Sequence, residues 1–192
     1  QQTDQEGACP ICLEKGVSWR LGTCDHAVFC SQECAGQYVR NSDNCPQCRK
    51  RFQIRTGPCP SGEARVLRWA NSLEGYPDCG HYEIQFDIQG GIQQEGRDPN
   101  PGVVYGARSV DCYLPDTPKG RHVGNMMMQC WRRGHLFKVG YSLTRNKDNV
   151  IVFADVHLKT VRQSTAKIPF GYPDADYLSR VEDELASKGF VV

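Results

Sequence analysis

The chain has 192 residues, which allows one large or two small domains, and its formal net charge is +1. A charge this close to zero gives no global basic field that would argue for nucleic-acid binding. We find no run of about 18 apolar residues and no signal peptide, so we expect no membrane association. Because the first residue is Gln1 and not Met, we expect this sequence to be the end piece of a longer protein.

Residues 1–8 are polar, and we predict a flexible N-terminal end there. The next stretch carries seven cysteines and one histidine in four close pairs: Cys9-x2-Cys12, Cys24-x-His26, Cys30-x3-Cys34 and Cys45-x2-Cys48. A single Cys-x2-Cys can be a chance spacing or a redox dithiol, but four successive pairs predict metal binding. Zinc prefers thiolate and imidazole ligands in closed, four-coordinate sites, so the sequence predicts two structural zinc ions.

The metal spacing bears on the redox compartment as well. Eleven cysteines would suggest disulfides in a secreted protein, but most of these have metal-ligand spacing, which favours a reducing compartment, cytoplasmic or nuclear. The other four are scattered, and we interpret them as small buried apolar residues: Cys59, Cys79, Cys112 and Cys130.

The order of elements predicts two modules. Within the zinc module, residues 9–52, Ser31 can cap a short helix that runs towards Arg40. A Pro- and Gly-rich stretch follows, and we interpret residues 53–62 as a short linker. Residues 63–192 are enough to bury a core of their own.

The second module mixes strands and helices. Alternation predicts a strand over His81–Ile88, ended by Gly90 and Gly91. Two further strands, Leu136–Tyr141 and Asn149–Phe153, flank a predicted turn at 145–148. We predict helices over Gly120–Arg133, whose core face carries Val123, Met126, Met127, Cys130 and Trp131, and over Asp176–Lys188, which ends before Gly189. The predicted fold class is α+β.

The four ligand pairs resemble a RING finger. That resemblance implies a cross-brace in which the first and third pairs (Cys9, Cys12, Cys30, Cys34) hold one zinc, and the second and fourth (Cys24, His26, Cys45, Cys48) hold the other. The family usually has two residues between the third-pair ligands, whereas this chain has three, so a MYND-like finger is the alternative.

RING fingers bind a ubiquitin-conjugating enzyme (E2) in a shallow apolar groove. The resemblance implies that Ile11 and Pro46 contact the E2, and that Arg49 bridges the E2 and its attached ubiquitin. The planar guanidinium can donate to carbonyls on two partners at once. The alternatives are a packed core residue for Ile11 and a solvated charge for Arg49.

Longer phrases characterise the second module: Gly75-Tyr76-Pro77-Asp78-Cys79-Gly80, Asp98-Pro99-Asn100-Pro101-Gly102, Cys112-Tyr113-Leu114-Pro115-Asp116, Lys119-Gly120-Arg121, Val156-His157-Leu158-Lys159-Thr160 and Gly171-Tyr172-Pro173-Asp174. In this order, after a RING finger, they resemble the Deltex C-terminal domain. The resemblance implies an E3 ubiquitin ligase linked to Notch signalling and to DNA-damage or antiviral responses. It also implies a groove for ADP-ribose or NAD.

The same resemblance assigns groove residues. Ser142, Thr144, His157 and Tyr172 would line the groove, and Glu184 would act as the base towards a ribose hydroxyl. The chain departs from the family at Phe170 and Leu158, which replace histidines, and the segment 107–112 is two residues shorter. Phe170 cannot carry a proton but could stack on a base or nicotinamide. The alternatives are a satisfied core histidine for His157 and a solvated helix charge for Glu184.

Three functions therefore stand open. The first is a RING-type E3 that brings a ubiquitin-charged E2 to a protein substrate, which is itself ADP-ribosylated in one version. The second is a binding module that reads ADP-ribose and uses the finger only as a scaffold. The third adds ubiquitin transfer to ADP-ribose or to nucleic-acid ends, and it requires Glu184 to act without a histidine partner.

Overall fold

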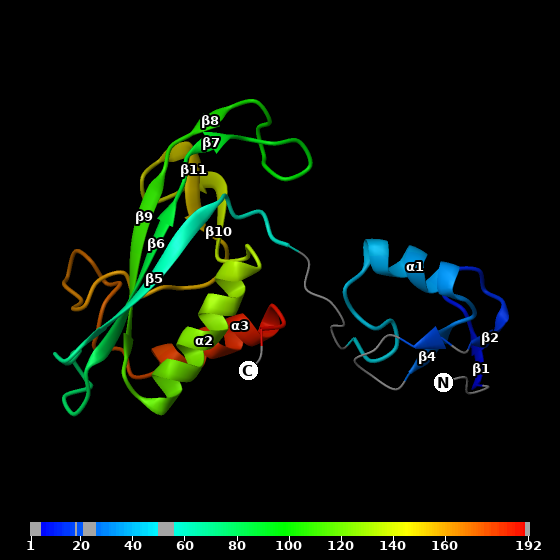
Figure 1. Ribbon diagram of the computed structural model, residues 1–192, viewed down its shortest axis with the longest axis horizontal. Helices are drawn as coiled ribbons and strands as arrows, with labels where there is room; N and C mark the ends of the chain where they lie inside the picture. The colour runs from blue at the N-terminus through cyan, green and yellow to red at the C-terminus, as the bar shows by residue number, and fades with distance from the viewer. Residues whose placement is uncertain (1–4, 18, 21–25, 50–55, 191–192) are drawn as a thin grey trace. The chain divides into compact units, whose positions relative to one another are not determined.

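The computed structural model describes residues 5–17, 19–20, 26–49 and 56–190, and the chain divides into two compact units, Gln1–Arg55 and Thr56–Val192 (Figure 1). In these ranges, every helix is too short or too polar to cross a membrane.

The first unit is a small finger. It contains β1 (Gln5–Ala8) paired with β2 (Lys15–Val17), β3 (Trp19–Arg20) paired with β4 (Ala27–Phe29), and α1 (Gln32–Asn41). Its core consists of Cys9, Val17, Val28 and Phe29, against which Ile11, Tyr38 and Val39 pack. Residues 5–8, predicted to be flexible, form a strand instead, because they pair with residues 15–17.

The predicted helix cap in the finger is confirmed. The Ser31 hydroxyl accepts a hydrogen bond from the backbone N–H of Cys34 at 3.3 Å, and α1 begins at the next residue. Because that cap satisfies one of the free N–H groups of the first helical turn, it fixes the position of Cys34 at the start of α1.

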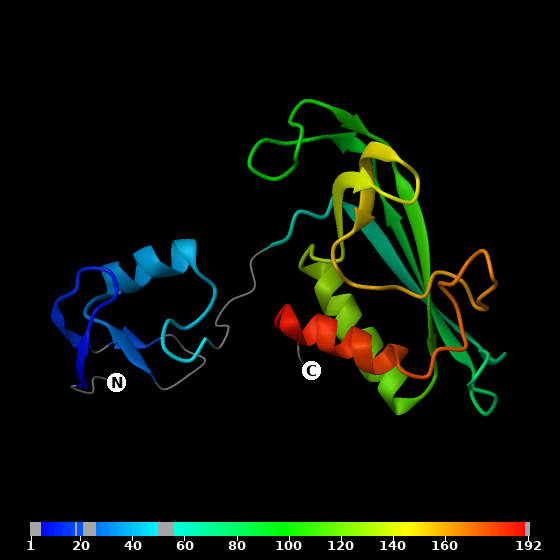
Figure 2. The ribbon, with the colours of Figure 1, turned by 180° about the vertical axis from the view of Figure 1, so that it is seen from behind.

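The second unit is built on a three-stranded antiparallel sheet in the order β5 (Gly62–Trp69), β6 (His81–Ile88), β9 (Arg108–Pro115). Two short hairpins are formed by β7 (Gly91–Ile92) with β8 (Val104–Tyr105), and by β10 (Phe137–Ser142) with β11 (Lys147–Phe153). The helices α2 (Pro118–Arg132) and α3 (Tyr177–Ser187) contact each other beside the sheet (Figure 2). This arrangement confirms the α+β fold class.

The predicted elements of this unit are confirmed with small shifts. The strand β6 has the predicted bounds, and α2 begins two residues early because Thr117 caps it, accepting from Gly120 N–H at 3.0 Å. The turn predicted at 145–148 lies two residues earlier, at 143–146, and β11 begins at Lys147. The strands β5 and β9 were not predicted.

Aromatic rings fill the space between α2 and the strands. The ring centroid of Phe86 lies 5.1 Å from Trp131 and 5.5 Å from Phe137, and Phe153 lies 5.6 Å from Phe137. The Met and Val stripe of α2 is buried, as predicted, together with Cys112 and Cys130. Cys59 and Cys79, predicted to be buried, are only partly so.

Part of the segment interpreted as a linker belongs to the second unit. The backbone N–H of Gly57 donates to the Arg133 carbonyl at 2.7 Å, and that of Cys59 donates to Gly134 at 3.0 Å. A Cβ at Gly57 would lie 2.1 Å from the Gly134 carbonyl oxygen, so the close approach of the two chains requires glycine here. Composition predicted a short linker here, whereas this glycine serves packing within the second unit; residues 53–55 lie outside the described ranges.

Candidate functional site: two cysteine clusters and a groove

Two turns of the finger have the same backbone geometry. In the first, Leu13 N–H donates to the Cys9 carbonyl at 2.8 Å; in the second, Arg49 N–H donates to the Cys45 carbonyl at 2.9 Å. Leu13 and Arg49 both have positive φ, +64° and +62°. Each turn therefore folds a Cys-x2-Cys pair tightly, so that both thiols can face one point.

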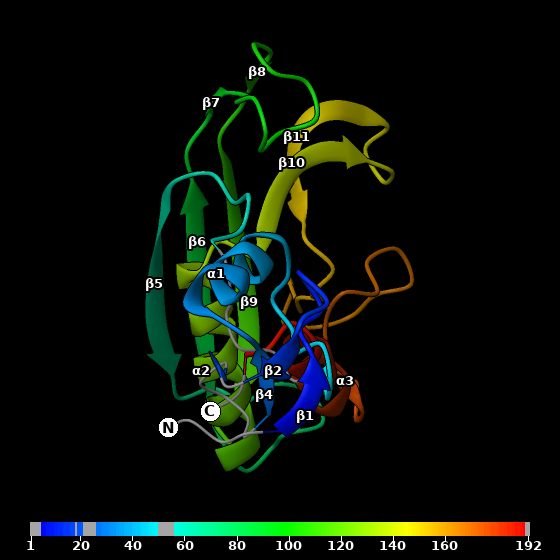
Figure 3. The same cartoon turned by 90° about the vertical axis from the view of Figure 1, so that its right-hand side faces the viewer.

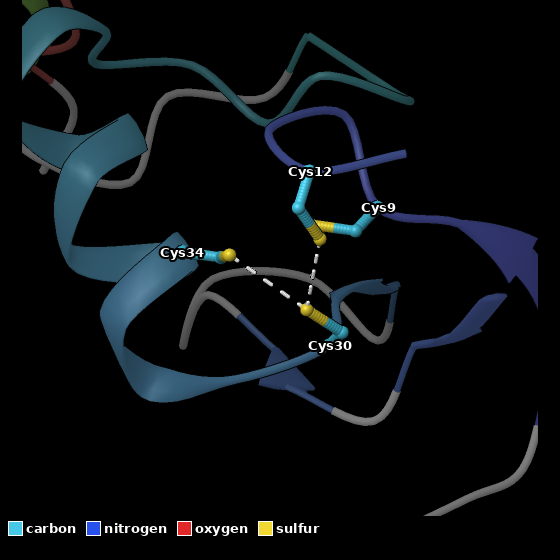
Figure 4. Close-up of side chains that lie close together, drawn as sticks. All are labelled: Cys9, Cys12, Cys30 and Cys34. Atoms are coloured by element: carbon cyan, nitrogen blue, oxygen red, sulfur yellow. Dashed lines mark hydrogen bonds between the residues drawn. The ribbon is translucent and has the colours of Figure 1, made fainter. Parts of the chain in front are cut away.

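The first cluster joins three parts of the finger. The Sγ atoms of Cys9, Cys12, Cys30 and Cys34 all lie within 4.8 Å of one another. Cys9 and Cys12 come from the first turn, Cys30 follows β4, and Cys34 lies in the first turn of α1 (Figure 4). The structure thus brings together the first and third pairs, the set that the RING resemblance implied.

The environment of these thiols favours a bound cation. Burial opposes ionisation of Cys9, but backbone hydrogen bonds, from Cys12 first, lower its pKa to about 6. The hydrogen bond with Cys12, 3.3 Å between the sulfurs, and then burial raise the pKa of Cys30 to about 12. Neighbouring thiols that shift in opposite directions resist ionising together, and a divalent metal removes that conflict because it stabilises all four thiolates.

The second cluster contains His26, Cys45 and Cys48, whose ligand atoms also lie within 4.8 Å of one another. The Nδ1 atom of His26 is buried and has no hydrogen-bond partner among the described residues. A bare buried imidazole nitrogen beside two thiols fits a metal ligand. Cys24, the predicted fourth ligand, lies outside the described residues. Both clusters therefore have the donor chemistry that zinc requires.

The three residues assigned to E2 contact differ in exposure. Ile11 is partly buried and packs against the finger core, Pro46 is partly buried in the second turn, and Arg49 is exposed. Leu13 was not predicted as a contact residue, yet it exposes 76% of its surface on the first turn. The left-handed backbone after Cys12 turns this side chain away from the core, a consequence that spacing alone does not reveal.

The second unit carries an open groove with an apolar floor. Phe153, Leu158 and Phe170 line its middle part. Towards α3 it widens into a hollow of about 350 Å³ that includes His157, Asp174, Arg180 and Glu184. Towards β9 it continues as a hollow of about 460 Å³, also lined by Arg108, Thr144 and Thr160.

Glu184 and His157 form a close pair in this groove. His157 Nδ1 lies 2.7 Å from Glu184 Oε1, and the backbone N–H of His157 donates to Oε2 at 2.9 Å. Both carboxylate oxygens are thus engaged by one residue. The structure places these two predicted residues together, with His157 exposed rather than in the core and Glu184 tied to the chain instead of solvated.

The other predicted groove residues separate into two groups. Thr144 and Phe170 line the groove, and Phe170 exposes half of its surface. Ser142 is buried, and its hydroxyl accepts from Arg145 Nε at 3.3 Å. Tyr172 is fully buried and its hydroxyl donates to the Tyr113 carbonyl at 2.9 Å, so the prediction that its ring lines the groove is wrong.

Two units with these sites define a class: a cysteine-rich, metal-binding finger joined to an α+β domain with an open groove. Residues 5–55 match the family model "Zinc finger, C3HC4 type (RING finger)", and residues 56–190 match the Deltex C-terminal domain. The chain therefore belongs to the Deltex C-terminal domain family and carries a RING finger before that domain.

Curated relatives align along nearly the whole chain. It is 38% identical to "E3 ubiquitin-protein ligase DTX4" of Mus musculus, over 96% of this chain and 33% of the relative. It is 35% identical to human "E3 ubiquitin-protein ligase DTX1", over 94% and 33%. It is also 35% identical to human "Probable E3 ubiquitin-protein ligase DTX3", over 97% and 53%. The chain thus spans between a third and about half of the length of these relatives.

Proposed function

We propose that this chain is the ubiquitin-transferring part of a RING-type E3 ubiquitin-protein ligase. The observation that carries the proposal is the pair of matched turns, which hold two ligand clusters and leave Arg49 exposed directly after the last ligand. The names of the aligned relatives support the same activity. Zinc, when bound, supplies the structural cross-links that fix the turns relative to each other.

In this proposal the finger does no covalent chemistry itself. Ile11 and Pro46 contact the E2, and Arg49 donates hydrogen bonds to carbonyls on both the E2 and its ubiquitin. Restricting the charged E2 to a reactive pose lowers the barrier through orientation. A protein substrate then supplies the attacking amine, and the second unit is available to hold that substrate.

A single-turnover discharge assay tests this role of Arg49. The variant Arg49→Asn removes the guanidinium but keeps a residue type that tolerates positive φ. Arg40→Ala, on the exposed face of α1, removes an equal charge and serves as the control. We expect Arg49→Asn to slow discharge of ubiquitin from a charged E2 by at least about tenfold, the value of one charge-assisted hydrogen bond, with zinc content unchanged. Equal rates for both variants would refute the proposal.

We further infer that the groove of the second unit binds ADP-ribose or NAD. Its apolar floor, the exposed ring of Phe170 and its size support a ligand with a flat ring and a sugar. Titration calorimetry with both ligands, alongside the discharge assay, separates the candidate functions. Binding without discharge supports a reader of ADP-ribosylated partners, whereas discharge without binding supports a plain protein-directed ligase.

Ubiquitin transfer onto ADP-ribose or nucleic-acid ends is less well supported. That reaction needs a free base near the ribose hydroxyl. The histidine that the family resemblance implies as the partner of Glu184 is replaced by Phe170, which cannot carry a proton. A discharge assay with free ADP-ribose as the acceptor tests it, and a Glu184-dependent ADP-ribose adduct would establish it.

A further inference from the structure

The strand β5 forms one edge of the sheet in the second unit. Among the described residues only β6 pairs with it, and β9 lies on the far side of β6 (Figure 3). Edge strands of soluble proteins are commonly blocked against further pairing by proline, a bulge or a covering segment. β5 contains no proline, keeps one register with β6 along its whole length, and is mostly exposed. Its outer edge is therefore open to another strand.

The register shows which backbone groups of β5 face outward. The N–H of Gln89 donates to the Ser61 carbonyl at 2.8 Å, and these two residues continue the β5–β6 register by one position. Hydrogen-bonded and non-hydrogen-bonded positions alternate along an antiparallel pair. The odd-numbered residues of β5 therefore bond to β6, whereas the N–H and C=O groups of Ala64, Val66 and Arg68 point away from it. These outward groups have no partner within the described ranges.

A hollow of about 200 Å³ opens beside this edge, between the sheet and α2. Apolar side chains from three strands and from α2 line it: Val66, Ile84, Leu114 and Met128. Val66 exposes 52% of its surface, whereas Ile84, its neighbour across the strand pair, exposes 2%. The apolar surface thus ends uncovered at β5, and an apolar side chain on an added strand would lie next to Val66 on the same face.

The rim of this surface carries excess positive charge. The carboxylate of Asp116, whose side chain is 5% exposed, accepts hydrogen bonds from Arg68 Nε at 2.7 Å and from Arg121 Nη1 at 2.6 Å. It is the single carboxylate that pairs with either arginine among the described residues, so one charge balances two. The two guanidinium-bearing side chains remain 71% and 49% exposed. An acidic residue on an added strand would neutralise this excess, whereas a second copy of this chain would bring a like charge.

We propose that β5 is a docking edge for an extended acidic segment of a partner protein, which joins the sheet as an additional strand. The outward main-chain groups of β5 supply the hydrogen bonds. An apolar side chain beside Val66 covers the hollow, and an acidic residue faces Arg68 and Arg121. Strand addition of this kind obtains affinity from the main chain and specificity from alternate side chains. The edge lies on the opposite side of the sheet from β9, so the proposal is independent of any ligand in the groove.

Fluorescence polarisation with a labelled synthetic peptide on the whole, zinc-loaded chain tests this docking edge. The peptide has eight residues, with two Glu at each end and alternating Val and Thr between them, and we expect saturable binding. Because only every second N–H of an added strand faces β5, N-methylation at alternate positions should weaken binding at least about tenfold in one register and little in the other. The same peptide with Lys in place of each Glu should bind about fivefold more weakly.

Two variants locate the site on the protein. Val66→Pro removes an N–H that faces away from β6, so the β5–β6 hydrogen bonds remain while the outer edge is blocked, and binding should weaken at least about fivefold. Arg121→Gln leaves Arg68 on Asp116 and should weaken binding about two- to fivefold. The control is Lys147→Gln, which removes an equal charge from β11 and should bind as the unmodified chain does.

The outcomes separate the possibilities. No saturable binding, equal binding of the Glu and Lys peptides, or an equal loss in Lys147→Gln would overturn the docking edge, as would unchanged affinity in Val66→Pro. If Val66→Pro does not fold, the two N-methylated peptides decide, because equal affinities for both registers exclude main-chain pairing. Light scattering without peptide tests the other occupant: a dimer of the unmodified chain that Val66→Pro abolishes would assign the edge to a second copy and reject the acidic partner.

Discussion

The buried ammonium of Lys159 gives the sharpest stability prediction. Its side chain is only 9% exposed, and Nζ lies 2.8 Å from Asp174 Oδ2 and 5.2 Å from the centroid of the Tyr177 ring. Asp174 also binds the exposed Arg180 through two hydrogen bonds, of 3.2 and 2.7 Å. Asp174 is thus the single carboxylate that compensates Lys159 among the described residues, and Asp174→Asn should leave a buried, uncompensated charge.

The magnitude follows from two routes. Removing one partner of a buried ion pair costs about 3–5 kcal/mol, and the remaining amide oxygen and partial exposure reduce this to about 2–3 kcal/mol. Hydrogen bonds from Arg180, then Lys159, outweigh burial and lower the pKa of Asp174 from 3.8 to about 2. That shift corresponds to about 2.4 kcal/mol, which solvent screening of this surface-proximal group reduces to about 1–2 kcal/mol. The two ranges meet at about 2 kcal/mol, which is the loss in unfolding free energy that we expect for Asp174→Asn.

The pH dependence has a definite sign. Because the folded-state pKa of Asp174 is depressed, its stabilisation is fully present above pH about 4 and disappears as the pH falls towards about 2. Asp174→Asn should therefore unfold more easily near neutral pH and lose less further stability in that acid window. Arg180→Gln removes a partner that is 55% exposed and should cost below about 1 kcal/mol.

Urea unfolding of the whole chain measures these differences. In a Trp19→Phe background the fluorescence comes from Trp69 and Trp131, both in the second unit, so the transition reports that unit. The double variant Lys159→Met/Asp174→Asn removes both charges and should be more stable than Asp174→Asn alone. A loss below about 0.5 kcal/mol in Asp174→Asn, or an equal loss in Arg180→Gln, would refute the reasoning.

Three further predictions concern metal and glycine. A strong chelator should remove two zinc ions per chain by elemental analysis and unfold the finger, at a cost on the order of 10 kcal/mol per ion, while the Trp69 and Trp131 transition persists. Gly120→Ala, whose Cβ would lie 2.0 Å from the Pro115 carbonyl oxygen, should destabilise the second unit by more than about 2 kcal/mol, whereas Gly124→Ala, 3.3 Å from a flexible Leu114 methyl, should stay within about 1 kcal/mol. The added Cβ of Gly36→Ala on α1 meets nothing within 4 Å, so this variant should stabilise the finger by up to about 1 kcal/mol through helix propensity and raise its melting temperature. Thermal scans should show a lower melting temperature of the second unit for Gly120→Ala than for Gly124→Ala, and a higher melting temperature of the finger for Gly36→Ala than for the unmodified chain.

Local chemistry made part of this fold predictable from sequence. Ser31 predicts the start of α1 because its capping hydrogen bond acts within one turn. The strand β6 is predictable because its residues alternate as in a half-buried strand. The strands β5 and β9 were not predicted because they are stabilised by pairing with β6, which a single segment of sequence does not reveal. Most of β5 is exposed, including Val66 and Trp69, and only pairing with β6 makes it a strand. Pairing over a long sequence separation leaves little trace in a single segment.

The sequence predicted which segments form the groove, but not which of their side chains line it. Tyr172 lies in a Gly-Tyr-Pro-Asp phrase typical of exposed turns, yet its hydroxyl reaches the Tyr113 carbonyl and the ring joins the core. Nothing in the sequence indicates that Arg108 and Arg145 lie close together, since one starts a strand and the other follows a hairpin strand far along the chain. Only the shared Ile151 carbonyl brings them together.

The chemistry of the groove favours binding over reaction at its own residues. At the α3 end, two hydrogen bonds with His157 fix the orientation of the Glu184 carboxylate. In the middle, Phe170 and Leu158 provide apolar surface, and at the β9 end Arg108 and the carboxylate of Asp111 line the same hollow. Apolar surface beside a guanidinium suits an anionic ligand with a flat ring, so we expect the groove to position a ligand more readily than to react with it. If ubiquitin leaves an E2 on this protein, the attacking amine is therefore expected to come from a substrate that the groove positions.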